Sequence, residues 1–271
     1  MKALTETAYA KINLALHVRR RREDGYHEIE TLFAFVDAGD VLTAEPAERD
    51  ELFVQGEFAP ALSDGFDNIV AKALNCMPRD SFWRVTLDKR LPVAAGLGGG
   101  SADAGAVFRM AARAQGLPED WRERAAKLGA DVPACVESLP AFGQGTGTDL
   151  EPGPTDLASV PVLLVNPRLP LATSTVFKTW DGQDKGALAH DTAREIALHG
   201  RNDLEAPAIG LCPPVADVLA ALAETGAWCV RMSGSGATCF ALYDGMDERN
   251  AARAAIAAAH PNWWTMPGRL R

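Results

Sequence analysis

The chain has 271 residues, of which 47% are hydrophobic and 23% are charged, close to the average of folded globular proteins. This length allows one large or two ordinary domains, each with its own core, and the composition argues against a disordered chain. The net charge of -9 argues against a general affinity for nucleic acid, which binds basic surfaces. An anionic ligand would therefore have to be held by a local site.

The cysteines and the N-terminal segment indicate the compartment. The five cysteines lie far apart and include no C-x-x-C pair, which argues against both a zinc site and a disulfide framework. Polar residues occupy the place where a signal peptide has its apolar core, and no apolar run reaches about 18 residues. We expect a cytoplasmic protein with reduced thiols and no membrane partner.

Residues 8–18 alternate between apolar and polar side chains, which predicts a half-buried β-strand. Lys11, Asn13 and His17 lie on the polar face of this predicted strand.

A hairpin is predicted next. The pair Asp24 and Gly25 suits a turn with positive φ, and residues 28–36 resume as a strand that begins near Tyr26 and His27. We interpret Arg19–Arg22 as a solvated loop.

The following segments predict a helix and then a strand. Residues 67–77 carry apolar side chains at helical spacing, with Asp67 as the N-cap. Residues 83–92 alternate as a strand and lead directly into a glycine-rich run.

Two helices are predicted after that run. Residues 101–115 are rich in alanine and end before Gly116, a C-terminal cap. Gly105 within this helix is expected to cost about 1 kcal/mol relative to alanine. Residues 118–128 have acidic residues in the first turn and basic residues in the last.

A change in composition at residues 150–161, with three prolines and a glycine, predicts a domain boundary near residue 155. The first domain then covers residues 1–155 and the second covers residues 156–271. In the second domain we expect a strand at 160–167, a helix at 214–226, two strands around a small-residue turn at 227–244, and a helix at 248–260. This arrangement is typical of the α+β class.

Residues 96–100 contain four glycines in five positions, directly before a predicted helix. Glycines allow unusual backbone conformations and let a ligand approach the amides, and a helix N-terminus attracts anions. The sequence of this run matches neither the G-x-x-x-x-G-K-[ST] motif nor the G-x-G-x-x-G motif of known phosphate-binding loops. A flexible turn is the alternative, but four glycines would cost much chain entropy, which favours a phosphate site.

Three motifs resemble those of the GHMP kinases, in the family's order: AKINLALHV near the start, LPVAAGLGGGSADA at the glycine run and RMSGSGATCFAL near the end. The longer segment at 10–40, together with LGADVPAC and NDLE, is most similar to the kinases of 4-diphosphocytidyl-2-C-methyl-D-erythritol. The resemblance covers nearly the whole chain and is weakest at 44–64 and 180–200.

The resemblance implies a two-domain α+β fold, with a ribosomal protein S5 domain 2-like N-terminal domain that binds ATP and a ferredoxin-like C-terminal domain that contributes to substrate binding. It places the active site between these domains. The implied activity is ATP-dependent phosphorylation of the 2-hydroxyl of 4-diphosphocytidyl-2-C-methyl-D-erythritol, in non-mevalonate isoprenoid precursor biosynthesis. Mg²⁺ would enter with ATP, and no metal is expected to be held by protein ligands alone.

The resemblance also implies that Lys11 and Asp131 are catalytic and flank the reacting hydroxyl. An aspartate can accept or orient the proton, and an ammonium group can offset charge on the transferred phosphoryl group. From the sequence alone, capping a short helix at 132–137 is the better interpretation of Asp131, and only the resemblance favours the catalytic role, with which capping is compatible. Ser101 is likewise suited to cap the helix at 101–115. Ser101 would otherwise contact a phosphate or help to hold Mg²⁺.

The remaining implied sites follow the family's motifs. ATP would be bound by Asn68, near the adenine, and by the loop residues Pro92, Val93, Ala94, Ala95, Gly96, Leu97, Gly98, Gly99, Gly100, Ser101 and Ala102. The substrate would be bound by Asn13, Tyr26, His27, Thr173 and Phe177, with two aromatic rings enclosing the cytosine. Core packing is the alternative role for Tyr26 and Phe177.

The turn Ser233–Ala237 would lie close to the active site, with a plain tight turn as the alternative. Two other functions remain open: a GHMP kinase for homoserine or mevalonate, and a catalytically silent sensor of a ligand.

Overall fold

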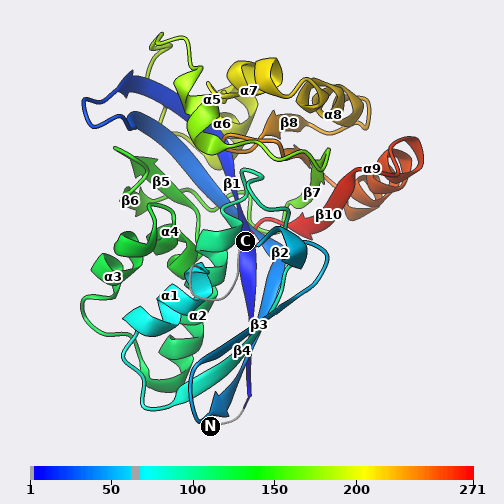
Figure 1. The fold of residues 1–271 in the computed structure, drawn as a ribbon. Helices are drawn as coiled ribbons and strands as arrows, with labels where there is room; N and C mark the ends of the chain where they lie inside the picture. Colours follow the sequence, from blue (N-terminus) through cyan, green and yellow to red (C-terminus); the bar gives the residue numbers. More distant parts are fainter. Residues whose placement is uncertain (1–2, 63–67) are drawn as a thin grey trace. The chain divides into compact units, whose positions relative to one another are not determined.

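The computed structural model describes residues 3–62 and 68–271 of the chain (Figure 1). The chain divides into two compact units, each built from separate segments. Unit 1 comprises Met1–Ala10, Gly39–Val93 and Gly98–Ser138, and unit 2 comprises Lys11–Ala38, Ala94–Leu97 and Leu139–Arg271. The long strands β1 (Leu4–Arg21) and β2 (His27–Ala47) therefore contribute residues to both units. The predicted boundary near residue 155 stays a prediction.

The other elements of unit 1 are β3 (Glu51–Gln55), a 3-10 turn (Ala59–Ala61), α1 (Ile69–Cys76), β4 (Phe82–Asp88), α2 (Gly99–Gln115), α3 (Trp121–Leu128) and α4 (Val132–Glu137). β4 pairs with β2 in the antiparallel sense and with β3 in the parallel sense. Its side chains alternate as the sequence predicts, since Trp83, Val85 and Leu87 are buried while Phe82 and Arg84 are exposed.

The helix predictions in unit 1 hold with shifted ends. α1 is capped by Asn68, whose Oδ1 accepts a hydrogen bond from the Val70 amide at 2.9 Å. The predicted cap, Asp67, lies outside the described residues. α2 ends before Gly116 as predicted, but it begins two residues early, at Gly99.

Gly105 has a packing role that the local sequence does not reveal. A Cβ atom at this position would lie 2.5 Å from the Cys135 carbonyl oxygen of α4. Figure 1 shows α2 lying against α4 and α1. Alanine would therefore push α4 away from α2, and the expectation that alanine suits this position better is wrong.

The elements of unit 2 alone are β5 (Ala141–Gln144), β6 (Asp149–Pro152), β7 (Pro161–Asn166), α5 (Thr173–Lys178), α6 (Ala193–His199), α7 (Glu205–Leu211), α8 (Pro214–Ala223), β8 (Cys229–Met232), β9 (Cys239–Leu242), α9 (Met246–Ala259) and β10 (Trp264–Arg269). Four strands form an antiparallel sheet in the order β10-β7-β9-β8. α8 packs against β8, and α9 packs against β10 (Figure 1). The helices and strands predicted within residues 156–271, and the α+β class, are confirmed.

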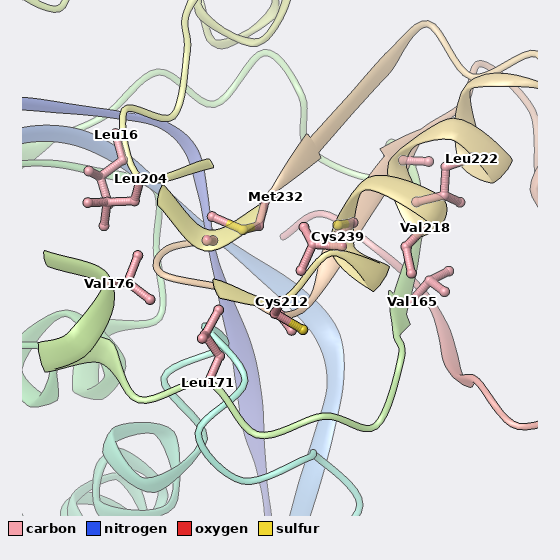
Figure 2. Close-up of a cluster of buried hydrophobic side chains, with 14 of the residues drawn as sticks. Leu16, Val165, Leu171, Val176, Leu204, Cys212, Val218, Leu222, Met232 and Cys239 are labelled. Atoms are coloured by element: carbon pink, nitrogen blue, oxygen red, sulfur yellow. The ribbon is translucent and has the colours of Figure 1, made fainter. Parts of the chain in front are cut away.

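The core of unit 2 lies between this sheet and its helices (Figure 2). Met232 and Cys239 come from the sheet, while Val218 comes from α8 and Val176 from α5. Full burial of an aliphatic side chain of this size stabilises a fold by about 1.5–3 kcal/mol. This core holds α5 in place, and α5 carries two of the predicted substrate residues, Thr173 and Phe177.

β1 differs from its prediction in two respects. The strand is buried on both faces: the exposed fractions of Lys11, Asn13 and His17 are 5%, 1% and 3%. Polar alternation indicated one solvent-exposed face, but other segments of unit 2 cover it. Arg19–Arg21 also belong to the strand rather than to a loop, and Arg19 forms salt bridges with Glu30 and Asp184.

Within the described ranges, no helix combines the length and the apolar character that a membrane span requires.

Candidate active site

The glycine-rich loop runs from the end of β4 to α2, and its backbone repeatedly enters the left-handed region. Ala94, Gly96 and Gly98 have φ angles of 53°, 75° and 60°. A Cβ atom at Gly96 would lie 2.2 Å from the Ser233 carbonyl oxygen, so both its φ and its surroundings require glycine.

The substitution Gly96→Ala is expected to lower the free energy of unfolding by about 1–3 kcal/mol more than Gly116→Ala does. Both glycines have positive φ, but a Cβ at Gly116 meets nothing within 4 Å among the described atoms. The pair therefore separates the steric collision from the backbone strain. Urea denaturation of both variants measures the difference, and equal losses would contradict the close approach.

The N-terminus of α2 offers backbone donors to an anion. The first hydrogen bond of the helix runs from the Ala102 amide to the Gly98 oxygen at 2.8 Å. The amides of Gly99, Gly100 and Ser101 precede it, in the turn where a helix leaves N–H groups without carbonyl partners. The residues present thus fit a phosphate group, and the absence of side chains at 98–100 leaves the backbone accessible.

Ser101 is not the N-cap that the sequence indicated. Gly98 holds that position in a left-handed conformation, and Ser101 is the third residue of the helix. The glycines let the chain turn into the helix before the serine is reached.

Lys11 is oriented by its neighbours in unit 2. Its Nζ donates to Asn13 Oδ1 at 3.1 Å and lies 4.8 Å from the centre of the Phe33 ring. Asn13 in turn donates from Nδ2 to Thr31 Oγ1 at 2.8 Å, and the Lys11 amide donates to the Leu97 oxygen at 3.0 Å. These contacts join two predicted site residues to the loop segment.

The small-residue turn at 233–237 contacts the same region. The Ser233 hydroxyl donates to the Gly96 oxygen at 2.8 Å and accepts from the Asn13 amide at 3.3 Å. The turn therefore links β1 to the loop segment of unit 2, although it also has the positive φ angles of a tight turn at Gly234 and Gly236.

Two of the predicted base-binding residues, His27 and Phe177, lie against each other in unit 2. The His27 ring lies 5.0 Å from the Phe177 ring and 5.8 Å, edge to face, from the Trp180 ring. Tyr26 is 67% exposed, so its ring is available to a ligand. The buried atoms His27 Nε2 and Trp180 Nε1 have no hydrogen-bond partner among the residues that the structure describes.

Burial, with a smaller contribution from Arg21, lowers the pKa of His27 below its usual value. The imidazole is therefore neutral at neutral pH and can both donate and accept a hydrogen bond.

α5 is held at both ends. Thr173, its first residue, shares a 2.9 Å hydrogen bond with the Ser235 hydroxyl. At the other end, the Arg21 guanidinium donates to the Lys178 oxygen at 3.0 Å and the Trp180 oxygen at 2.6 Å. These contacts fix the helix that carries Phe177.

Asp131 and Asn68 belong to unit 1. Asp131 occupies the N-cap position of α4, but its side chain makes no capping hydrogen bond in the described part of the chain. The predicted capping role of Asp131 is therefore wrong. Asn68 is 8% exposed and its Oδ1 caps α1, so its amide group is already oriented by the helix.

Sequence reasoning missed three residues of this region: Trp180, Thr31 and Ser233 as an individual side chain. Trp180 could have been found by its spacing of three residues from Phe177. Nothing local distinguishes Thr31 from other threonines of a strand. Across residues 3–62 and 68–271, no group of three or more His, Cys, Asp or Glu side chains is arranged to hold a metal ion.

Family models match both halves of the chain. Residues 68–138 match the GHMP kinases N-terminal domain, and residues 186–262 match the GHMP kinases C-terminal domain. These matches, together with the observed elements, confirm the predicted two-domain α+β fold.

Full-length relatives identify the family more narrowly. A 4-diphosphocytidyl-2-C-methyl-D-erythritol kinase of Novosphingobium aromaticivorans is 68% identical over 99% of this chain and 93% of the relative. A protein of the same name from Erythrobacter litoralis is 62% identical over 99% of this chain and 100% of the relative.

Solved structures agree. A crystal structure of a 4-(cytidine 5'-diphospho)-2C-methyl-D-erythritol kinase is 33% identical, with a TM-score of 0.81 over 98% of this chain and 99% of that one. A homoserine kinase from Cytophaga hutchinsonii shares the fold at 17% identity, with a TM-score of 0.71 over 100% of this chain and 96% of that one. The chain therefore belongs to the 4-diphosphocytidyl-2-C-methyl-D-erythritol kinase family of the GHMP kinases.

Proposed function

We propose that this protein is a kinase that phosphorylates the 2-hydroxyl of 4-diphosphocytidyl-2-C-methyl-D-erythritol with ATP, in non-mevalonate isoprenoid precursor biosynthesis. The observation that carries the proposal is the 68% identity, over 99% of the chain, to a relative of that name. The cytoplasm is the proposed location, which the free thiols of all five cysteines support.

For the nucleotide, we propose that Asn68 and the loop Pro92–Ala102 bind ATP, which supplies the phosphoryl group. The first-turn amides of α2 would donate hydrogen bonds to its phosphates, which the glycines at 98–100 leave accessible. Mg²⁺ would bind mainly through phosphate oxygens, as it commonly does in kinases, with the Ser101 hydroxyl as an additional ligand.

For the reacting group, we propose that Asp131 accepts or orients the proton of the 2-hydroxyl. Asp131 lies at the start of α4, and a carboxylate can take up the proton of a hydroxyl group or orient it through a hydrogen bond. Lys11 would offset the negative charge that develops during transfer, and its Nζ is oriented by a 3.1 Å hydrogen bond to Asn13 Oδ1.

For the rest of the substrate, we propose that Tyr26 and Phe177 enclose the cytosine ring and that His27 reads its edge. His27 Nε2, which has no hydrogen-bond partner among the described residues, supports this role, because a buried polar atom needs a partner. Asn13 and Thr173 would contact the erythritol and the diphosphate.

We also propose that the ATP-binding domain covers residues 1–155 and that residues 156–271 form the domain that contributes to substrate binding. Phe177 and Thr173, which lie in the second range, support that division of roles.

The function is tested by measuring ADP release with Mg·ATP and each of three alcohols. These are 4-diphosphocytidyl-2-C-methyl-D-erythritol, called the cytidylyl substrate below, homoserine and mevalonate. Turnover of the cytidylyl substrate alone is expected, since the other two alcohols lack a base for the aromatic residues. Turnover of homoserine or mevalonate instead would retain the loop's role and reject the base site. Ligand binding without turnover would make the protein a silent sensor.

A further inference from the structure

Three charged side chains lie buried together in unit 1, next to both flanks of the glycine-rich loop. Lys89, Asp40 and Asp103 are 2%, 0% and 2% exposed. Lys89 Nζ donates to Asp40 Oδ2 and to Asp103 Oδ2, each at 2.6 Å. Asp40 belongs to β2 and Asp103 to α2, so one ammonium group joins two elements that are distant in sequence.

Asp40 holds the chain where it enters the loop. Its Oδ1 accepts hydrogen bonds from the amides of Arg90 at 2.6 Å and Leu91 at 2.7 Å. Pro92 has no N–H group, so these two amides are the last backbone donors before the loop. Lys89 is itself fixed by its own amide, which donates to the Gln55 oxygen at 2.7 Å.

Asp103 holds the chain where it leaves the loop. It lies in the second turn of α2, the helix that begins at Gly99. A Cβ atom at Gly99 would lie 3.2 Å from Lys89 Nζ and 3.7 Å from Leu91 Cβ. The ammonium group therefore lies directly beside the first residue of the helix, and glycine allows this approach.

Stability alone does not account for such a cluster. Each buried ion costs several kcal/mol of desolvation, and well-packed apolar side chains are often as stabilising or more so. Burial opposes the positive charge of Lys89, yet the two carboxyl groups outweigh it and raise the pKa of the amine. Burial raises the pKa of Asp103, whose Oδ1 has no hydrogen-bond partner in the described ranges. Charged groups contribute geometric specificity, because each of their hydrogen bonds fixes the distance and the angle between donor and acceptor.

We propose that Lys89, Asp40 and Asp103 are positioning residues for the nucleotide, which hold the two flanks of the glycine-rich loop so that the first-turn amides of α2 are arranged for phosphate before ATP binds. The inference rests on the proposed function, since it takes the loop as the ATP site. None of the three side chains needs to touch the nucleotide. A loop ordered in advance loses less entropy on binding, which raises the affinity.

The substitution Asp40→Asn tests the proposal, because it keeps the shape of the side chain and removes its charge. Asp50→Asn is the matched control: Asp50 Oδ2 accepts from Arg79 at 2.6 Å and its Oδ1 accepts from the Trp83 amide at 2.9 Å, near the opposite end of β4. Two readouts are needed: amide hydrogen exchange of residues 92–102 without nucleotide, and the Kd of ADP with Mg²⁺ by calorimetry.

We expect Asp40→Asn to speed exchange in the loop and to raise the Kd of Mg·ADP by about tenfold, while the Kd of cytidine 5'-diphosphate stays within about twofold. Asp50→Asn should change none of these. If Asp40→Asn fails to fold, Asp103→Asn replaces it, because that variant leaves the contacts of Asp40 with Arg90 and Leu91 in place. In the double variant the two effects should add less than fully, since the two carboxylates share Lys89.

The proposal is overturned if Asp40→Asn has the wild-type exchange rates at residues 92–102 and the wild-type Kd for Mg·ADP, while its free energy of unfolding falls as much as that of Asp50→Asn. This outcome is distinct from a failure of the proposed function. A wild-type protein that does not bind Mg·ADP would reject the nucleotide site itself. Wild-type binding with unchanged variants would reject only the positioning role.

Discussion

The Asp131→Asn protein is expected to fold normally and to turn over about 10²- to 10⁴-fold more slowly than the wild type. Loss of a group that transfers a proton in the transition state has an effect of this size. Asparagine has nearly the same shape as aspartate but cannot take up the proton. The measurement is kcat for the cytidylyl substrate at saturating Mg·ATP.

Stability should change little, because asparagine keeps the shape of the aspartate side chain and one of its acceptor oxygens. What is lost is its favourable charge at a helix N-terminus, worth about 0.3–1 kcal/mol. A matched control is Asp120→Asn, since Asp120 holds the same N-cap position in α3. Its Oδ1 accepts a hydrogen bond from Arg124 Nε at 2.8 Å. This control should leave kcat unchanged.

The size of the decrease distinguishes two roles for Asp131. A loss below about tenfold, comparable to that of one hydrogen bond, would assign it the orientation of the hydroxyl rather than proton transfer. Wild-type turnover in Asp131→Asn would remove this residue from the mechanism altogether.

The second large effect is expected at the base site. Tyr26→Ala should raise KM for the cytidylyl substrate by about 5- to 150-fold and leave KM for ATP unchanged. Stacking of a base on an aromatic ring is worth about 1–3 kcal/mol, which converts to that range. Steady-state kinetics with each substrate varied in turn provides the measurement.

Tyr26 is the more informative of the two stacking residues to replace. Its ring is 67% exposed, so its loss should change the free energy of unfolding by less than about 0.5 kcal/mol. Phe177 also packs against the core of unit 2, so its replacement would change both substrate binding and the free energy of unfolding. Phe82→Ala is the control, because Phe82 is 54% exposed and lies in unit 1. An unchanged KM in Tyr26→Ala would show that the base does not stack on this ring.

Local patterns in the sequence determined most of the secondary structure. The alternation at 83–88 gave a strand with Trp83, Val85 and Leu87 buried, and helical spacing with Gly116 at the end gave α2. These predictions hold because side-chain period and capping residues act over a few positions of the chain. The glycine run was recognisable for the same reason, since its backbone freedom belongs to the residues themselves.

The roles of several residues depended on contacts that no local pattern encodes. β1 has a polar face that looks exposed, yet Asn13 is buried and its amide donates to Ser233, 220 positions later. Gly105 looks unfavourable in a helix until the Cys135 oxygen is found 2.5 Å from where its Cβ would be. Likewise, a serine ahead of a helix looks like a cap, but Gly98 ends the loop first.

The sequence by itself thus determined the elements, the glycine-rich loop and the family motifs. Only the tertiary structure decided which side chains surround each functional group: Asn13 beside Lys11, Trp180 beside His27, and the buried Lys89 with its two carboxylates. The physical reason is that burial and hydrogen-bond pairing are set by segments distant in the chain, whereas periodicity and backbone conformation are set by neighbours.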